Sequence, residues 1–90
     1  MKPHVHSTHP ELIKRLKRAS GHLNKVIQMI ESDQPCLAIA QQVHAVEKAV
    51  NHSKKILIHD HIDHCLAHVL HDESPSEHTI GEFKEITKYL

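Results

Sequence analysis

The sequence predicts an all-α protein built from three helices, and three observations support this prediction. The 90 residues include only two glycines and four prolines. Apolar residues recur at alternating spacings of three and four along two long segments, which is the pattern of a helix with one apolar face. No segment shows the strict alternation of a half-buried strand. Ninety residues make one small domain, which gains from oligomerisation because a single core of this size buries little surface.

The first helix is predicted over about residues 9–32, following an N-terminal arm over residues 1–8 that has no periodicity. Thr8 and Glu11 have the spacing of a capping box, and Pro10 is tolerated in a first helical turn. Residues 9–90 would form the single helical domain. The apolar seam of the first helix has coiled-coil-like spacing and consists of Leu12, Leu16, Ala19, Leu23, Val26 and Ile30.

The second helix is predicted over residues 35–71, after a turn at residues 32–34. No glycine or proline occurs between Cys36 and Ser74, so the sequence favours one uninterrupted helix. At about 1.5 Å per residue, the stretch from Cys36 to His71 would span roughly 54 Å. This helix carries two apolar rows, one to pack on the first helix and one that needs a partner. The rows are Ile39, Val43, Val46, Val50, Ser53 and Leu57, and Ala45, Ala49, Ile56, Ile62 and Leu66.

The third helix is predicted over residues 75–90. Ser74 would cap it, and Pro75 would occupy its first position, where a missing N–H costs nothing. Its apolar face consists of Ile80, Phe83, Ile86 and Leu90.

The spacing of cysteine and histidine in the second helix predicts a metal site. His61 and Cys65 lie four apart, so they share one helix face and can bind one ion. Cys36 would lie about 38 Å from His61 on the same helix. All three can act together only if a second copy lies antiparallel and supplies its own Cys36. The spacing therefore predicts a two-fold dimer with two equivalent sites between chains. In the alternative interpretation, the cysteines are small buried apolar residues.

Two thiolates and an imidazole suit Cu(I) in a three-coordinate site, or Ni(II), Co(II) or Zn(II) if a fourth ligand joins. The arm and the start of the first helix offer His4, His6 and His9 as that fourth ligand. A histidine cluster near the end of the second helix could instead be a zinc-loading surface, with His64 and His68 as additional or adventitious binders. It comprises His59, His61, His64, His68 and His71.

Charge is unevenly distributed although the formal net charge is zero. Residues 1–25 hold six Lys or Arg against one Glu, a balance of +5, and residues 59–90 hold seven acids against two Lys, a balance of −5. A segregated basic region predicts a polyanion-binding surface, and phosphate-backbone binding is its natural use. No named DNA-reading motif is present, so specificity would come from spaced contacts and DNA shape. The basic clusters are Lys14, Arg15, Lys17 and Arg18, and Lys54 with Lys55.

Other classes of protein are disfavoured. The chain has no nucleophile elbow, no phosphate-cradling glycine loop and no paired-carboxylate cleft, and the Cys65–His61 pair lacks an orienting group. The sequence therefore predicts that the protein is not an enzyme. The absence of a signal peptide and of a long apolar run argues against secretion and membrane spanning and predicts a cytoplasmic protein. The two cysteines would then be reduced.

The chain resembles the CsoR/RcnR/FrmR family of bacterial metal-sensing, and in one branch formaldehyde-sensing, transcriptional repressors. The resemblance covers about residues 9–90. It is carried by residues 15–23 (RLKRASGHL), 29–36 (MIESDQPC), 42–46 (QVHAV) and 59–65 (HDHIDHC). It implies a three-helix protomer, an antiparallel dimer and a tetramer of two such dimers. It also implies operator binding without effector and release when effector binds.

The resemblance also implies roles for single residues. Cys36, His61 and Cys65 match the Cys-His-Cys ligands of the copper-sensing branch. The formaldehyde branch has Glu at the last of these positions, so Cys65 argues against formaldehyde. His4 matches an N-terminal ligand of the nickel- and cobalt-sensing branch. Residues 8–10 and 59–66 look most like the nickel/cobalt-responsive NreA/DmeR-type subgroup.

Positions outside the ligand set match the family less fully. Arg15 and Lys55 match basic positions that contact the operator, with Lys14, Lys17, Arg18 and Lys54 as their neighbours. Glu82 lies at or beside a third-helix carboxylate that supports the copper site. Pro35 replaces the tyrosine that precedes the first cysteine in copper sensors, so their coupling route is not implied here.

Together these observations predict a repressor that binds operator DNA without metal and is released by Ni(II) or Co(II), which derepresses metal efflux or resistance genes. Two alternatives stay open: a Cu(I)-sensing repressor of the same family, and a metal-buffering protein without DNA function. The order of metal affinities does not choose between nickel and copper, because copper binds most such sites more tightly.

Overall fold

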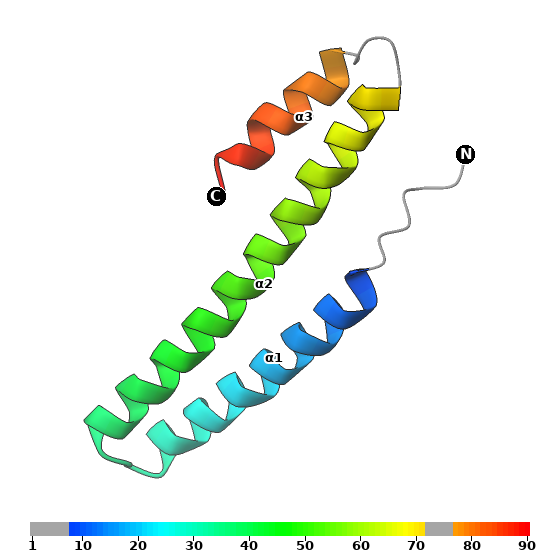
Figure 1. The fold of residues 1–90 in the computed structure, drawn as a ribbon. Helices are drawn as coiled ribbons and strands as arrows, with labels where there is room; N and C mark the ends of the chain where they lie inside the picture. Colours follow the sequence, from blue (N-terminus) through cyan, green and yellow to red (C-terminus); the bar gives the residue numbers. More distant parts are fainter. Residues whose placement is uncertain (1–7, 72–76) are drawn as a thin grey trace.

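The computed structural model describes residues 8–71 and 77–90, without the side chains of residues 68–71. It contains α1 (His9–Glu31), α2 (Cys36–His71) and α3 (Glu77–Thr87), and the described residues include no strand. α1 folds back along the first part of α2, and α3 lies against the last part of α2 on the opposite side (Figure 1). The molecule is elongated, with extents of 60 × 24 × 16 Å. The predicted three-helix, all-α fold is confirmed.

The predicted capping box at the start of α1 is wrong. Thr8 has helical backbone angles (φ −80°, ψ −19°), and its side chain makes no capping hydrogen bond. Its carbonyl already accepts the Leu12 N–H at 2.9 Å. A capping side chain needs extended backbone angles to reach the N–H groups of the first turn. Glu11 instead lies 4.0 Å from Arg15, one turn along the helix.

The turn between α1 and α2 is a Schellman motif. The Gln34 N–H donates to the Met29 carbonyl (3.0 Å) and the Asp33 N–H to the Ile30 carbonyl (3.2 Å), which satisfies carbonyls that the helix end leaves free. Asp33 takes the left-handed conformation this motif requires, with φ 55°. Aspartate tolerates that region better than most non-glycine residues. The chain therefore reverses within four residues, and α2 can pack on α1.

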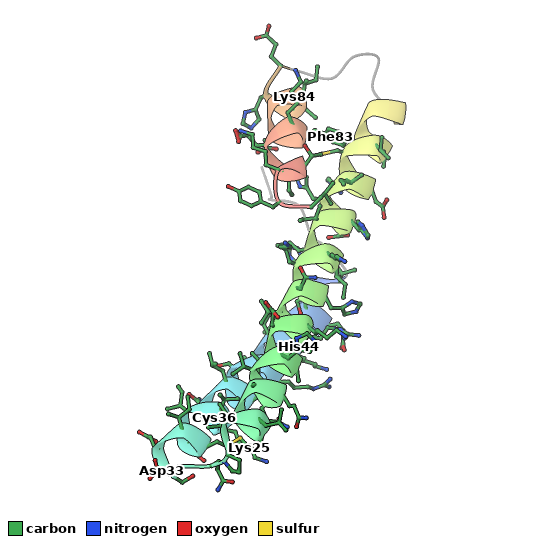
Figure 2. The ribbon with its side chains drawn as sticks, turned by 90° about the vertical axis from the view of Figure 1, so that its left-hand side faces the viewer. Lys25, Asp33, Cys36, His44, Phe83 and Lys84 are labelled. Atoms are coloured by element: carbon green, nitrogen blue, oxygen red, sulfur yellow. The ribbon has the colours of Figure 1, made fainter. Side chains whose placement is uncertain are left out.

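α2 is one uninterrupted helix of 36 residues, as predicted. The Pro35 carbonyl accepts the Ile39 N–H (3.1 Å), so Pro35 caps the helix and Cys36 is its first residue. Figure 2 shows Cys36 beside the turn that holds Asp33, at the opposite end of the molecule from Phe83 and Lys84 of α3. No helix in the described part of the chain combines the length and hydropathy needed to cross a bilayer.

α3 is shorter than the predicted 75–90. Its described part begins at Glu77, residues 75–76 lie outside the described residues, and it ends at Thr87. The Thr87 hydroxyl donates to the Lys84 carbonyl (2.7 Å). The N–H groups of Lys88, Tyr89 and Leu90 each bond a carbonyl three residues back. Such bonds satisfy the last carbonyls of a helix and tighten its final turn, so the α-helix does not continue to the chain end.

The α1–α2 interface buries only every second member of the predicted seam. Leu12, Ala19 and Val26, each seven apart, are buried on α1, and Val46 and Ser53 are buried on α2. The Ser53 hydroxyl donates to the Ala49 carbonyl (3.1 Å), so this buried polar group is satisfied within its own helix.

Many of the other predicted core residues are exposed. Leu16, Leu23 and Ile30 of α1 are 43–56% exposed, and Val43, Val50 and Leu57 of α2 are 42–45% exposed. In the second predicted row, Ala45, Ala49 and Leu66 are exposed and Ile56 and Ile62 are half-buried. Ile13 and Ile27 join the exposed positions of α1. We call the apolar stripe the set Ile13, Leu16, Leu23, Ile27 and Ile30 of α1 with Val43, Val50 and Leu57 of α2.

Candidate metal centre

His61 and Cys65 form a preassembled donor pair on α2. The Cys65 Sγ lies 3.4 Å from the His61 Nε2, as expected for residues four apart on a regular helix. Cys65 is only 8% exposed, and Ile58, seven residues before it, is 2% exposed. Cys65 lies near α3, because the charge of Glu82 on that helix acts on its thiol. The two predicted ligands therefore lie next to each other in the single chain, and their binding of a metal ion stays a prediction.

Burial raises the pKa of the Cys65 thiol, and the negative charge of Glu82 on α3 raises it further. Burial acts because a thiolate loses solvation in an apolar environment. A raised pKa keeps the thiol protonated at neutral pH, whereas a metal ion binds the thiolate. A metal ion that binds Cys65 would therefore have to displace this proton, and its affinity should fall by about tenfold per pH unit of acidification for each proton released.

We expect the Glu82→Gln change to lower the pKa of the Cys65 thiol without returning it to the value of an exposed cysteine, because burial is the larger cause. The ultraviolet absorbance of the thiolate, followed against pH in metal-free Cys36→Ala protein, measures this pKa. Glu85→Gln is the matched control, since Glu85 lies three residues after Glu82 on α3 but is not a cause of the shift. Equal midpoints for Glu82→Gln and the parent would contradict the assignment.

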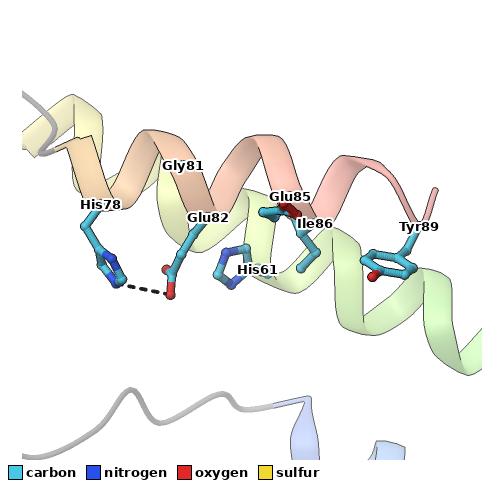
Figure 3. Close-up of a pocket in the computed structure, with 7 residues that line it drawn as sticks. All are labelled: His61, His78, Gly81, Glu82, Glu85, Ile86 and Tyr89. Atoms are coloured by element: carbon cyan, nitrogen blue, oxygen red, sulfur yellow. Dashed lines mark ion pairs between the residues drawn. The ribbon is translucent and has the colours of Figure 1, made fainter.

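A pocket of about 480 Å³ opens between α2 and α3 beside this pair (Figure 3). His61 is its lining residue from α2, and the α3 residues around it include Glu82 and Ile86. The Glu82 carboxylate lies 3.3 Å from the His78 Nε2, one turn earlier on α3. Glu82 thus lies close to the candidate ligands, and its predicted support of a metal site stays a prediction.

Cys36 does not reach this pair within one chain. It is exposed at the first position of α2, and about 38 Å of helix separates it from His61. Within the described residues, no three His, Cys, Asp or Glu side chains come together in a way that could hold a metal ion. The single chain therefore presents two separate parts of the predicted Cys-His-Cys site, as the sequence reasoning required.

Apart from His9, the other histidines named from the sequence are of two kinds: those outside the described residues or without a described side chain, and those with a described side chain. His4 and His6 lie outside the described residues, as do the side chains of His68 and His71. His64 is half-buried and His59 is exposed. The predicted roles of His4, His6 and His64 therefore stay predictions.

His9, the third histidine proposed near the arm, opens α1, and its Nε2 lies 3.8 Å from an Asp60 carboxylate oxygen. Asp60 immediately precedes His61 in α2. The start of α1 is thereby placed next to the part of α2 that carries the donor pair.

The basic residues lie on α1 and around the middle of α2. Lys14, Lys17 and Arg18 are exposed on α1, and Lys54 and Lys55 are exposed on α2. Arg15 and Arg18 line a cleft of about 200 Å³ between the two helices. Arg15 and Arg18 are therefore brought together with α2, while the lysines remain on the surface.

Sequence reasoning missed two histidines of this cleft, His22 and His52. A signal for His22 was present, because it lies seven residues after Arg15 and four after Arg18 and so shares their helix face. It also missed His78, Glu85 and Tyr89 in the α2–α3 pocket. Their positions on α3 became meaningful only once α3 was placed against α2.

Comparison with known proteins agrees with this architecture. Residues 8–89 match the family described as metal-sensitive transcriptional repressor. The copper-sensing transcriptional repressor CsoR of Bacillus subtilis is 33% identical over 82 residues, covering 87% of this chain and 80% of that protein. CsoR of Mycobacterium ulcerans is 34% identical over 55 residues, covering 61% of this chain and 47% of that protein. The chain thus spans about half the length of the mycobacterial relatives it matches.

Among solved structures, the nickel-responsive transcriptional regulator InrS is similar over 99% of this chain and 100% of that chain, with a TM-score of 0.82 and 27% identity. Both copper- and nickel-responding proteins are therefore similar to this chain. The matched family consists of repressors rather than enzymes, which confirms the prediction on that point. Because the family match covers nearly the whole chain, the protein belongs to the metal-sensitive transcriptional repressors, the group that its resemblance to CsoR, RcnR and FrmR indicated.

Proposed function

We propose that this protein is a cytoplasmic repressor that binds operator DNA without metal and is released when Ni(II) or Co(II) binds a Cys/His site between two chains. Release would derepress genes for metal efflux or resistance. The observation that carries this proposal is the position of the two half-sites, Cys36 and the His61–Cys65 pair, at opposite ends of one helix.

The exposed residues of α2 connect the two half-sites in one line. Successive residues of an α-helix are rotated by about 100° around its axis. On this basis, one face of α2 that extends about 40° to either side of a line along the helix contains both half-sites and the three exposed valine and leucine residues between them. It includes Cys36, Val43, Val50, Leu57, His61 and Cys65, together with Ile39. The charged Glu47 and Lys54 also lie within this face, and their long side chains can extend to the rim of a contact. The α1-facing residues Val46 and Ser53 lie to one side of this face, and Ile58 lies to the other. A second chain that covers this line would therefore touch both half-sites.

The same line indicates where the two-fold axis of the proposed dimer would cross α2. If Cys36 of one chain meets residues 61–65 of the partner, the midpoint of the overlap falls at residue 49 or 50. Val50 is the central member of Val43, Val50 and Leu57, which are seven residues apart and exposed. An antiparallel pair of α2 helices would thus bury the apolar row symmetrically, and the apolar stripe on α1 would extend the contact. Burial of such a row is the usual driving force for helix association in water.

We propose that the site comprises Cys36 of one chain with His61 and Cys65 of the partner subunit. His4 is the proposed fourth ligand, with His6 and His64 as weaker candidates. The His9–Asp60 contact supports this, because His4 lies five residues before His9 and an extended chain of that length reaches up to about 17 Å. Glu82 would lie behind the ligands, where its charge favours the cation. Two such dimers would form the tetramer.

Nickel or cobalt is favoured because a mixed thiolate–imidazole set with an additional histidine suits a four-coordinate ion. The likeness in fold to a nickel-responsive regulator is consistent with this choice. Without the arm ligand, Cys36, His61 and Cys65 alone would suit three-coordinate Cu(I), which is the alternative effector.

The DNA would lie on the basic residues of α1 and α2. Arg15 and Lys55 are the proposed principal contacts, with Lys14, Lys17, Arg18 and Lys54 beside them. Because each metal site joins two chains, metal binding would change the relative tilt of the helices that carry these residues. Linkage then requires that metal weaken DNA binding by the same factor by which DNA weakens metal binding.

The test uses reduced protein and a duplex that the metal-free protein selects from a random-sequence pool. We expect salt-dependent binding of this duplex and its release on titration with Ni(II), at one ion per chain and with a thiolate–nickel absorption spectrum. His4→Ala should alter the spectrum and weaken nickel binding by about tenfold or more, whereas His44→Ala, a change at an exposed histidine, should not.

The other outcomes separate the alternatives. Release by Cu(I) but not Ni(II), with an unchanged spectrum for His4→Ala, would identify a copper sensor and leave the arm without a role. Tight metal binding without selection of any duplex would identify a metal-buffering protein.

A further inference from the structure

The cleft between α1 and α2 is strongly basic. Of its seven lining residues, Arg15, Arg18 and His22 come from α1 and His52 from α2, and the other three are Ala19, Ala49 and Ser53. No carboxylate is among these lining residues. The cleft has a volume of about 200 Å³, enough to admit a group of the size of a phosphate. It lies between the two helices that carry the proposed DNA contacts.

Arg15 in this cleft has an unused donor. Its Nε is buried without a hydrogen-bond acceptor, and the carboxylate oxygen of Glu11 lies 4.0 Å away, beyond hydrogen-bond distance. A buried donor of a charged group without an acceptor is costly. An anion that enters the cleft from solvent would supply the missing acceptor and would meet the charge of Arg18 as well.

The position of His22 gives the cleft a proton-dependent donor. Its Nε2 lies 2.6 Å from the Gln42 amide oxygen of α2, which can only accept a hydrogen bond. With Nε2–H donating to Gln42, the Nδ1 of a neutral His22 ring carries a lone pair, and it becomes a donor only when the ring is protonated. Neutral His22 would therefore repel an anion through that atom, and protonated His22 would bind it.

We propose that His22 and His52 are phosphate-contacting residues of the operator interface and that they take up protons when DNA binds. This inference rests on the proposed DNA-binding function and adds a dependence on pH to it. The charged or titratable side chains that line the cleft with His22 are Arg15, Arg18 and His52. Those that line it with His52 are Arg15, Arg18 and His22. A phosphate bound between these side chains would place its negative charge next to both rings, which favours their protonated form. Proton uptake is thus coupled to DNA binding.

The coupling predicts a direction for pH. Histidine is the side chain that changes charge near neutrality, so acidification from about pH 8 to pH 6 should tighten DNA binding. With up to two protons taken up, we expect a gain in affinity of about tenfold or more over this range. Acidification also weakens metal binding, as derived above for the thiol ligand. Both effects would hold the repressor on DNA in acid.

The experiment measures binding of the selected duplex by reduced, metal-free protein with chelator present, at pH 6 and pH 8. The test variant is His22→Gln/His52→Gln, because glutamine keeps a donor toward Gln42 but does not titrate. His44→Gln is the matched control, since His44 is exposed on α2 and does not line the cleft. Helical content and unfolding temperature verify that each variant is folded.

We expect the parent and His44→Gln to gain about tenfold or more in affinity between pH 8 and pH 6, and the double variant to show no such gain between the two pH values. The slope of log K against log salt should steepen at pH 6 by about 0.9 for each histidine that becomes charged, and only in proteins that keep both histidines.

Two results would overturn the inference while leaving the repressor intact: the same pH dependence in parent and double variant, or an equal loss of binding by the double variant at both pH values. If no duplex is selected at either pH, the DNA-binding function itself fails.

Discussion

Metal-dependent release should be lost in the Cys36→Ala variant while DNA binding stays within about twofold of the parent. Cys36 lies at the start of α2, about 20–25 Å of helix from the cleft residues Ala49, His52 and Ser53, and it is exposed, so its removal leaves the α1–α2 packing unchanged. The site would lose one thiolate of its proposed ligand set, and a lost ligand typically costs at least as much as the 10–100-fold associated with a lost supporting partner. DNA release at increasing Ni(II), read by fluorescence anisotropy, measures both quantities. Release of Cys36→Ala at the metal concentration of the parent would contradict the bridged site.

Mixing two inactive variants provides a sharper test of the bridge between chains. In a dimer of one Cys36→Ala chain and one His61→Ala chain, one site carries both defects and the other site is intact. Mixed dimers should therefore recover half of the metal sites, although each variant alone has none. Refolding the two variants together and counting tightly bound nickel gives the result. No recovery on mixing would mean that each site is built within a single chain.

The second large effect concerns the predicted two-fold axis. Val50→Asp should make the protein monomeric, because two carboxylates would face each other where two valines would otherwise be buried. Loss of one buried valine from each chain costs about 1.5–3 kcal/mol per side chain, and the buried like charges add to this. A total of about 4 kcal/mol or more corresponds to a dimer weakened at least about a thousandfold.

Sedimentation velocity at micromolar concentration measures this change, and loss of nickel binding should accompany it because each site needs two chains. Ala45→Asp is the matched control, since Ala45 is exposed on the face of α2 opposite Val50. It should leave both the assembly and nickel binding unchanged. If Val50→Asp remains a dimer with nickel bound, the axis does not pass near Val50.

The long central helix illustrates what a single sequence can establish. Its 36 residues contain no glycine or proline, and local propensity over such a stretch admits only one interpretation, so its extent was predicted to within one residue. The His61–Cys65 pair followed as well, because helix periodicity fixes the relation between residues four apart. The distance between Cys36 and this pair needed only the rise per residue.

The seam of α1 shows the limit of that reasoning. Leu12 and Leu16 have the same hydropathy and periodic spacing, yet the first is buried and the second is exposed on the apolar stripe. Periodicity places both on one broad face, but it does not say which part of the face meets α2 and which part is left for another chain. That division depends on the angle at which the helices pack, which the Asp33 turn sets.

The sequence by itself determined the three helices, the proximity of His61 to Cys65 and their separation from Cys36, because each depends on the regular geometry of a single helix. The tertiary structure decided the rest: the charge of Glu82 acts on Cys65, His9 lies against Asp60, and His22 and His52 meet the arginines in one cleft. Each of these contacts joins residues on two helices. They form only where packing brings the helices together, and local sequence carries no direct record of that arrangement.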